Sequence, residues 1–192
     1  MVTASQVAFL ILIGAVAAQR LWELRISRTH ELAILKAGGR EHAPGQMAVM
    51  RALHGAWIVS MAVEVMVFNR PLRVEVAVPA FGVFAIGQAL RIAAIRALGP
   101  RWTVKIMTLP GVPAIGRGIF RWVRHPNYVG VALEIFALPL VHGAWVTSLI
   151  FTAANALLLR ARIQAEEIAL AEDSAYESVL GRRARFVPWI VG

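Results

Sequence analysis

The sequence predicts an all-α protein that is polytopic, crossing a membrane about five times. Hydrophobic residues make up 58% of the 192 residues, and the mean hydropathy of +0.64 is far above that of a soluble domain with one core. The apolar residues gather in long stretches that short charged segments separate. A bilayer is the simplest solvent for such a chain, because a spanning helix needs roughly 20 mostly apolar residues.

Five stretches qualify as spanning helices, two of them by a narrow margin. The third is expected to end at Gly99-Pro100, and Pro139 is expected to bend or end the fourth. A tight turn at His142-Gly143 then leads into the fifth, which continues past Arg160 into water. The predicted ranges are 5–24, 47–68, 74–98, 127–141 and 144–173.

The basic residues predict how these helices are oriented. Lys and Arg are frequent in the segments 25–40, 101–124 and 160–185, whereas the connection between the second and third helices holds only Arg70 and Arg73. Because cytoplasmic loops carry the excess of Lys and Arg, we expect the N-terminus outside and the C-terminus in the cytoplasm. No repeat or linker interrupts the chain, so residues 1–192 are expected to form a single domain.

Composition excludes several kinds of site. The chain has no cysteine, so it has neither disulfides nor thiolate ligands. The five histidines are dispersed without partners at metal-ligand spacing, which predicts no metal. A net charge of +9 in short runs between apolar stretches indicates contact with anionic lipid headgroups rather than with nucleic acid. Gly116-Arg117-Gly118 lacks the preceding strand and the third glycine of a dinucleotide fingerprint.

The residues that suggest chemistry lie between Gly99 and the C-terminus. Arg124-His125-Pro126-Asn127-Tyr128-Val129-Gly130 is expected at the start of the fourth helix, since proline suits the first helical position. His125 and Tyr128 then flank a first turn whose free N–H groups can receive an anion. Arg162 and Glu166, four residues apart on the fifth helix, can pair on one face. A solvated, salt-bridged helix end would also explain that pair.

In order and spacing, these motifs resemble the isoprenylcysteine carboxyl methyltransferase family. The shared pattern is RHPxYxG, a helical hairpin, RIxxEE and a terminal segment, here Tyr176, Arg185 and Phe186-Val187-Pro188. The resemblance covers roughly residues 99 to 190, the expected catalytic half. LGPRWTVKIMTLPG and HPNYVGVALEIFALPL are similar to a bacterial branch whose members O-methylate alkylpyrones and alkylresorcinols. That branch implies the bacterial inner membrane.

The resemblance implies S-adenosylmethionine as the methyl donor and S-adenosylhomocysteine as the product. It implies a cytoplasmic cofactor pocket capped by the C-terminal segment, and a tunnel between helices for a lipophilic or prenylated acceptor. It also implies that Arg162 positions an acceptor oxygen and that Glu167 orients Arg162 or acts as a base. The implied donor-binding residues are Gly118, Arg124, His125, Pro126 and Tyr128, and the implied catalytic residues are Arg162, Glu166 and Glu167.

Two ionisable residues within the predicted spans are candidates for the acceptor pocket. Ionisable groups inside a membrane usually face a cavity or one another, which indicates a role for His54 and Glu134. A structural pairing, such as Glu134 with Arg91, would explain Glu134 equally well.

Two other functions remain open from the sequence. One is methylation of a phospholipid amine, since such membrane methyltransferases share a similar RHPxY and EE pattern. The other is a non-enzymatic transport or lipid-binding protein, which predicts polar residues concentrated at mid-membrane. Here the densest polar cluster lies in the expected cytoplasmic loop and tail, which favours an enzyme.

Overall fold

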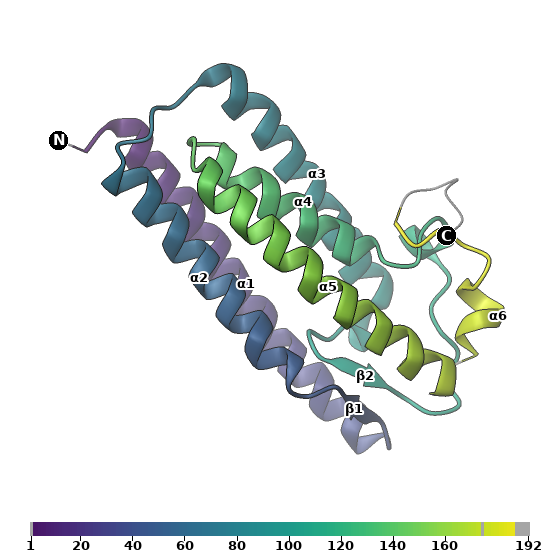
Figure 1. Ribbon diagram of the computed structural model, residues 1–192. Helices are drawn as coiled ribbons and strands as arrows, with labels where there is room; N and C mark the ends of the chain where they lie inside the picture. Colours follow the sequence, from purple (N-terminus) through teal and green to yellow (C-terminus); the bar gives the residue numbers. More distant parts are fainter. Residues whose placement is uncertain (1, 174, 187–192) are drawn as a thin grey trace.

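The computed structural model describes residues 2–173 and 175–186, and over these ranges it is mostly helical (Figure 1). The only sheet in them pairs two three-residue strands in antiparallel register. This confirms the predicted all-α class. The helices are α1 (Ala4–Lys36), α2 (Gln46–Val67), α3 (Val74–Leu98), α4 (Pro126–Leu140), α5 (Trp145–Asp173) and α6 (Tyr176–Leu180), with 3-10 turns η1 (Gly99–Arg101) and η2 (Gly118–Arg121) and strands β1 (Arg40–His42) and β2 (Ile106–Thr108).

Four of these helices, α1, α2, α3 and α5, are long and apolar enough to cross a membrane. Large apolar side chains such as Ile11, Val59, Val78 and Leu157 point outward from them and are more than half exposed. Such surfaces are rare on soluble monomers and suit contact with lipid. The chain is therefore a polytopic integral membrane protein, as predicted.

The fourth apolar helix is shorter than the others. With 15 residues, α4 is about 22 Å long, whereas the 25 residues of α3 give about 37 Å. The first helix differs in the other direction, because α1 continues beyond the predicted span and ends at Lys36. Because α4 is short and α1 is long, the segment that precedes α4 lies beside the C-terminal part of α1.

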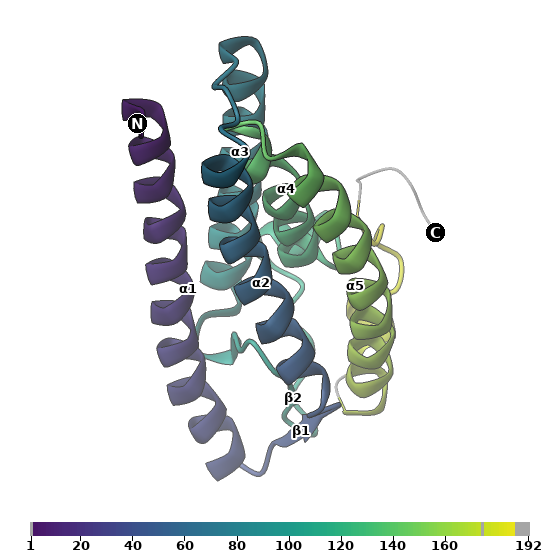
Figure 2. The same ribbon diagram turned by 60° about the vertical axis from the view of Figure 1, so that its left-hand side comes forward.

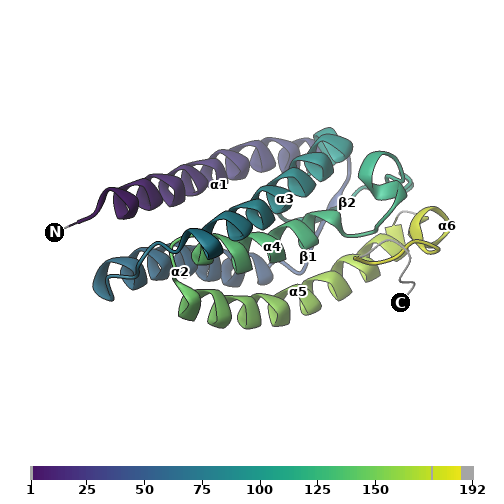
Figure 3. The ribbon, with the colours of Figure 1, turned by 90° about the horizontal axis from the view of Figure 1, so that it is seen from above.

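The helices run roughly along one direction and form a bundle with two distinct ends (Figures 1 and 2). One end, here called the turn end, holds the α2–α3 and α4–α5 connections. The other, here called the cavity end, holds the two strands, η2 and α6. Seen from above in Figure 3, α4 lies within the bundle, where it packs against α3 and α5.

The turn end is closed by packing and by one buried carboxylate. Side chains from α1, α2, α3 and α4 form a shared apolar core there. Glu64 of α2 accepts hydrogen bonds from the backbone N–H of Thr147 at 2.7 Å and from its hydroxyl at 2.8 Å. Arg70 adds an ion pair to Glu64 at 3.1 Å. The first turn of α5 is thus held to α2.

Two glycines bring α3 and α4 close together. A Cβ added at Gly130 would lie 2.7 Å from the carbonyl oxygen of Gly87, and a Cβ at Gly87 would lie 2.9 Å from that of Gly130. No larger residue fits this contact without a shift of the backbone. This close contact fixes the position of α4 along the axis of α3.

Gly87→Ala is expected to lower the stability of the bundle, because overpacking a close contact typically costs about 1–3 kcal/mol. Gly82→Ala is the matched control on the same helix, since a Cβ there meets no atom within 4 Å. We expect a lower melting temperature in detergent for Gly87→Ala alone. Equal melting temperatures for the two variants would contradict this packing.

Candidate active site

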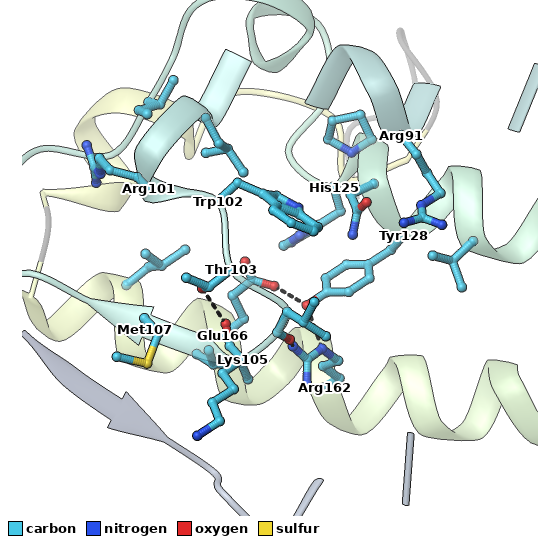
Figure 4. A pocket seen from close by; sticks show the side chains of 18 of the residues that line it. Arg91, Arg101, Trp102, Thr103, Lys105, Met107, His125, Tyr128, Arg162 and Glu166 are labelled. Carbon is cyan, nitrogen blue, oxygen red and sulfur yellow. Dashed lines mark hydrogen bonds between the residues drawn. The ribbon is translucent and has the colours of Figure 1, made fainter. Parts of the chain in front are cut away.

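A cavity of about 250 Å³ lies at the cavity end, beneath the first turn of α4. Since α4 is short, residues 99–125 must run across this end of the bundle before the chain enters the helix. The walls come from all six helices and from the 101–109 segment. Figure 4 shows side chains from α4, α5 and the 101–107 segment facing one another across this space.

The start of α4 is held by the C-terminal segment. The backbone N–H of Arg124 donates to the carbonyl of Ala184 at 2.9 Å, and that of His125 donates to the carbonyl of Arg185 at 3.1 Å. Within the first turn, the N–H groups of Tyr128 and Val129 donate to the carbonyl of His125. These four N–H groups are therefore already paired. Fewer such groups are free to bind an anion than was expected from the start of a helix.

Tyr128 links α4 to α5 through its hydroxyl. That hydroxyl donates to Glu166 and accepts a hydrogen bond from Nε of Arg162 at 3.0 Å (Figure 4). A further guanidinium nitrogen of Arg162 donates to the carbonyl of Val104. Arg162 and Glu166 are thus connected by the phenol rather than by a direct ion pair. The guanidinium is held in one orientation at the cavity wall.

Glu167 makes a separate cluster with the start of α4 and the tail. It is hydrogen-bonded to Nε2 of His125 at 2.9 Å and to Nη2 of Arg185 at 2.8 Å. Arg124 approaches the same carboxylate at 3.6 Å. Glu167 therefore orients His125 and the tail. Arg162 takes its orientation from Tyr128 and Val104.

The extended part of α1 supports the opposite wall. The Ser27 hydroxyl accepts the backbone N–H of Val104 at 2.8 Å, and Nδ1 of His30 is 2.7 Å from the carbonyl of Trp102. Lys105 is anchored to Glu41 at 2.8 Å, and this hydrogen bond raises the pKa of Lys105. The segment that carries Trp102 into the cavity is thus attached to α1 and β1.

The two strands and α6 complete the enclosure. His42 of β1 contacts the Thr108 hydroxyl of β2 at 2.7 Å, and Thr108 in turn donates to Asp173 at the end of α5. Tyr176 of α6 lines the cavity, and burial raises the pKa of its hydroxyl well above its usual value. Tyr176 is therefore a neutral phenol at physiological pH.

At the start of α4, two residues that line the cavity have a buried polar atom with no hydrogen-bond partner within the described ranges: Arg124, through Nε, and Asn127, through Oδ1. Buried polar atoms are normally paired, so each such exception calls for an explanation. One is a donor and the other an acceptor. A ligand with both a negative and a positive group would pair both of them.

Comparison with known proteins identifies the family. The model of the isoprenylcysteine carboxyl methyltransferase (ICMT) family matches residues 80–172, which hold α4, most of α5 and the cavity segment between Gly99 and Arg124. The uncharacterized protein YpbQ of Bacillus subtilis (strain 168) is 35% identical over 167 residues, or 86% of this chain and 98% of the relative. The chain belongs to the isoprenylcysteine carboxyl methyltransferase family.

A second relative matches over a similar length. An uncharacterized protein of Haemophilus influenzae (strain ATCC 51907 / DSM 11121 / KW20 / Rd) is 28% identical over 165 residues, or 83% of this chain and 93% of the relative. Family membership and the four spanning helices together make this protein a membrane methyltransferase.

Most of the residues predicted for the site of this methyltransferase surround one cavity. Its lining includes seven of them: His54, Arg124, His125, Pro126, Tyr128, Arg162 and Glu166. Glu167 is not among the described residues that line the cavity, but it is hydrogen-bonded to His125, which is. Of the predicted tail motif, Val187 and Pro188 lie outside the described residues.

Two predicted residues have structural surroundings instead. Gly118 adopts a φ of +62° against Ala97, a conformation that glycine accommodates more easily than other residues, and it is not among the described residues that line the cavity. Glu134 lies in a buried ion-pair cluster. It pairs with Arg91 at 3.2 Å and with Arg20, so the pairing that the sequence left open is the one that the structure contains.

Sequence reasoning missed several residues of the site. Asn127 lies inside the recognised motif without having been given a role. Arg20 and Glu23, which pair with each other at 2.7 Å, line the cavity wall formed by α1. Their spacing of three residues at the end of an apolar span was the available signal.

Glu167→Gln is expected to release the tail from the methyltransferase core. The charged hydrogen bonds that it removes typically contribute about 1.5–3 kcal/mol, and each 1.4 kcal/mol is about tenfold in an equilibrium. We therefore expect trypsin to cut at Arg182, Arg183 or Arg185 about tenfold faster or more. Glu172→Gln, which alters an exposed residue of the same helix, is the control. Equal cleavage rates for the two variants would show that Glu167 does not hold the tail.

Proposed function

We propose that this protein is an S-adenosylmethionine-dependent O-methyltransferase that acts on a lipophilic acceptor at the membrane surface. The observation that supports this most strongly is the shared cavity. It is lined by the His125–Tyr128 turn of α4, by Arg162 and Glu166 of α5, and by apolar side chains of α1 and α2. A polar region that suits a methyl donor and an apolar region that suits a lipophilic acceptor therefore lie side by side in this cavity.

The residues around the start of α4 suit the donor. S-adenosylmethionine bears a carboxylate, an ammonium and a positively charged sulfur, and it supplies the methyl group. The unpaired Nε of Arg124 can donate to a carboxylate, and the unpaired Oδ1 of Asn127 can accept from an ammonium. The rings of Trp102 and Tyr128, which also line the cavity, suit a cation, because aromatic faces attract positive charge.

The part of the cavity toward α1 and α2 suits a hydrocarbon chain. Leu24, Ile34, Met47 and Met50 line it, and methionine adapts to irregular apolar ligands. These helices expose apolar surface to the bilayer. We propose that the acceptor's hydrocarbon chain is buried here and that the cavity end faces the cytoplasm, since Lys and Arg gather at that end.

Arg162 is the residue best placed to position the acceptor oxygen. Its Nε and Nη2 are bonded to Tyr128 and Val104, whereas Nη1 has no hydrogen-bond partner in the part of the chain that the structure describes. A donor fixed in this way can hold an oxygen near the methyl group while the cavity excludes water. Positioning of this kind contributes a large share of catalysis in transfer reactions.

The proposed function predicts both binding and turnover. Calorimetry should detect binding of S-adenosylhomocysteine to the detergent-solubilised protein. Membranes containing the protein should transfer labelled methyl groups to at least one of four acceptors: a prenylated cysteine analogue, an alkylresorcinol, an alkylpyrone or phosphatidylethanolamine. Label on oxygen supports the proposal, whereas label only on the phosphatidylethanolamine nitrogen would replace it with amine methylation. No S-adenosylhomocysteine binding to folded protein would refute an enzyme that uses this donor.

Tyr128→Phe tests the hydrogen-bonded link between α4 and α5. The ring remains, but Arg162 loses the acceptor of its Nε hydrogen bond. We expect methyl transfer to fall about tenfold or more, because one buried hydrogen bond contributes about 0.5–1.5 kcal/mol and more when a partner is charged. The variant's melting temperature serves as the folding control. Unchanged turnover would exclude Tyr128 from the positioning of Arg162.

A further inference from the structure

A neutral hydroxyl must lose its proton when its oxygen is methylated, whereas a carboxylate acceptor is already ionised. The base that takes this proton should lie in the cavity with a free lone pair. Several ionisable groups at the cavity are already engaged. Glu23 is paired with Arg20 and Arg91, and Nε2 of His125 is bonded to Glu167.

Glu166 is a less suitable base. It already accepts the Tyr128 hydroxyl, so part of its carboxylate is engaged. General bases work best when their basicity is close to the operating pH. A histidine with one free ring nitrogen would therefore serve better.

His54 of α2 has a free ring nitrogen in the cavity wall. Its Nδ1 lies 2.9 Å from the carbonyl oxygen of Met50. Because a carbonyl only accepts, Nδ1 carries the hydrogen, and the neutral ring keeps its lone pair on Nε2. No hydrogen-bond partner for Nε2 occurs within residues 2–173 and 175–186. The ring edge is further held against Trp57, with centroids 6.4 Å apart.

His54 also lies at the depth of the donor-binding turn. At about 1.5 Å per residue, His54 is about 20 Å from the turn end of α2, and Tyr128 is about 18 Å from the turn end of α4. Both line the same cavity, as do Arg20, Arg51 and Arg162. The apolar residues proposed to bury the acceptor chain are neighbours of His54 on α2, namely Met47 and Met50.

From this geometry, and resting on the proposed function, we propose that His54 is the catalytic base for acceptors with a neutral hydroxyl. Nε2 removes the hydroxyl proton as a lone pair of the oxygen forms the bond to the methyl carbon. The carbon–sulfur bond breaks with its electron pair left on sulfur, which becomes a neutral thioether. The proton remains on His54 and is then lost to water.

The test compares two acceptors that differ in acidity but not in chain length. One is a long-chain 4-alkylphenol, and the other is the same phenol acidified by a ring nitro group. His54→Gln keeps a donor for the Met50 carbonyl but has no basic nitrogen, and His54→Ala lacks both. We expect each variant to lose about 10²-fold or more with the plain phenol, in the range of general-base effects, and much less with the nitrophenol. Added 4-methylimidazole should partly restore His54→Ala.

His30→Gln is the matched control, because Nδ1 of His30 also contacts a backbone carbonyl but His30 is not among the described residues that line the cavity. Any effect of this variant should be the same for both phenols. S-adenosylhomocysteine affinity in the His54 variants should match that of the wild type, which shows that the donor site is intact.

Three results would overturn the role of His54. They are equal losses of the His54 variants on both phenols, no loss on either, and a wild type that methylates only carboxylates. In each of these cases the wild type still binds S-adenosylhomocysteine. If it does not bind, the proposed function fails, and the role of His54 fails with it.

Discussion

The short length of α4 is the constraint on which the rest of the cavity end depends. The close contact of Gly87 with Gly130 fixes α4 against α3, and α4 reaches the turn end with only 15 residues. Its first turn therefore starts part-way along α3 rather than at the end of the bundle. The longer helices α1 and α5 extend past this point and form the walls of the cavity.

Polar groups at this depth must find partners within the protein, because burying an unpaired charge is costly. The structure supplies those partners in two clusters. Tyr128 joins Arg162 to Glu166, and Glu167 joins His125 to the tail. Each cluster uses one of two adjacent glutamates on α5. The two glutamates of the RIxxEE motif thus differ in their contacts. Glu166 lies at the cavity wall, whereas Glu167 bonds His125 and the C-terminal segment.

Much of the fold follows from the sequence because spanning helices are set by length and apolar content. The third helix was predicted with the ends that it has, and the fifth was predicted to continue to Asp173. The strands β1 and β2 were missed, since their three-residue pairing joins positions 64 to 68 residues apart and leaves no periodic signal. The extension of α1 to Lys36 was missed because a charged amphipathic end resembles a loop in hydropathy.

The residues of the site could be predicted where they belong to a short sequence motif. Their hydrogen-bond partners were harder to predict where these lie far away in the sequence. The resemblance implied that residues of RHPxY and of RIxxEE belong to one site, and in the structure side chains of the two motifs are hydrogen-bonded to each other. The sequence alone did not specify that Glu167 would bond His125 and Arg185 rather than Arg162, because a motif does not show which of several nearby side chains an acidic residue will contact. Glu134 was ambiguous for the same reason. Its two partners, Arg91 and Arg20, lie 43 and 114 positions away.

The central claim is that the cavity beneath α4 binds the methyl donor. The most direct measurement is ultraviolet cross-linking of methyl-labelled S-adenosylmethionine to the protein in membranes, followed by mass spectrometry of the labelled peptides. The account predicts label on residues 101–109, 124–128 or 162–166, and loss of that label when excess S-adenosylhomocysteine competes. Label confined to peptides outside the cavity, or label that S-adenosylhomocysteine does not displace, would contradict it.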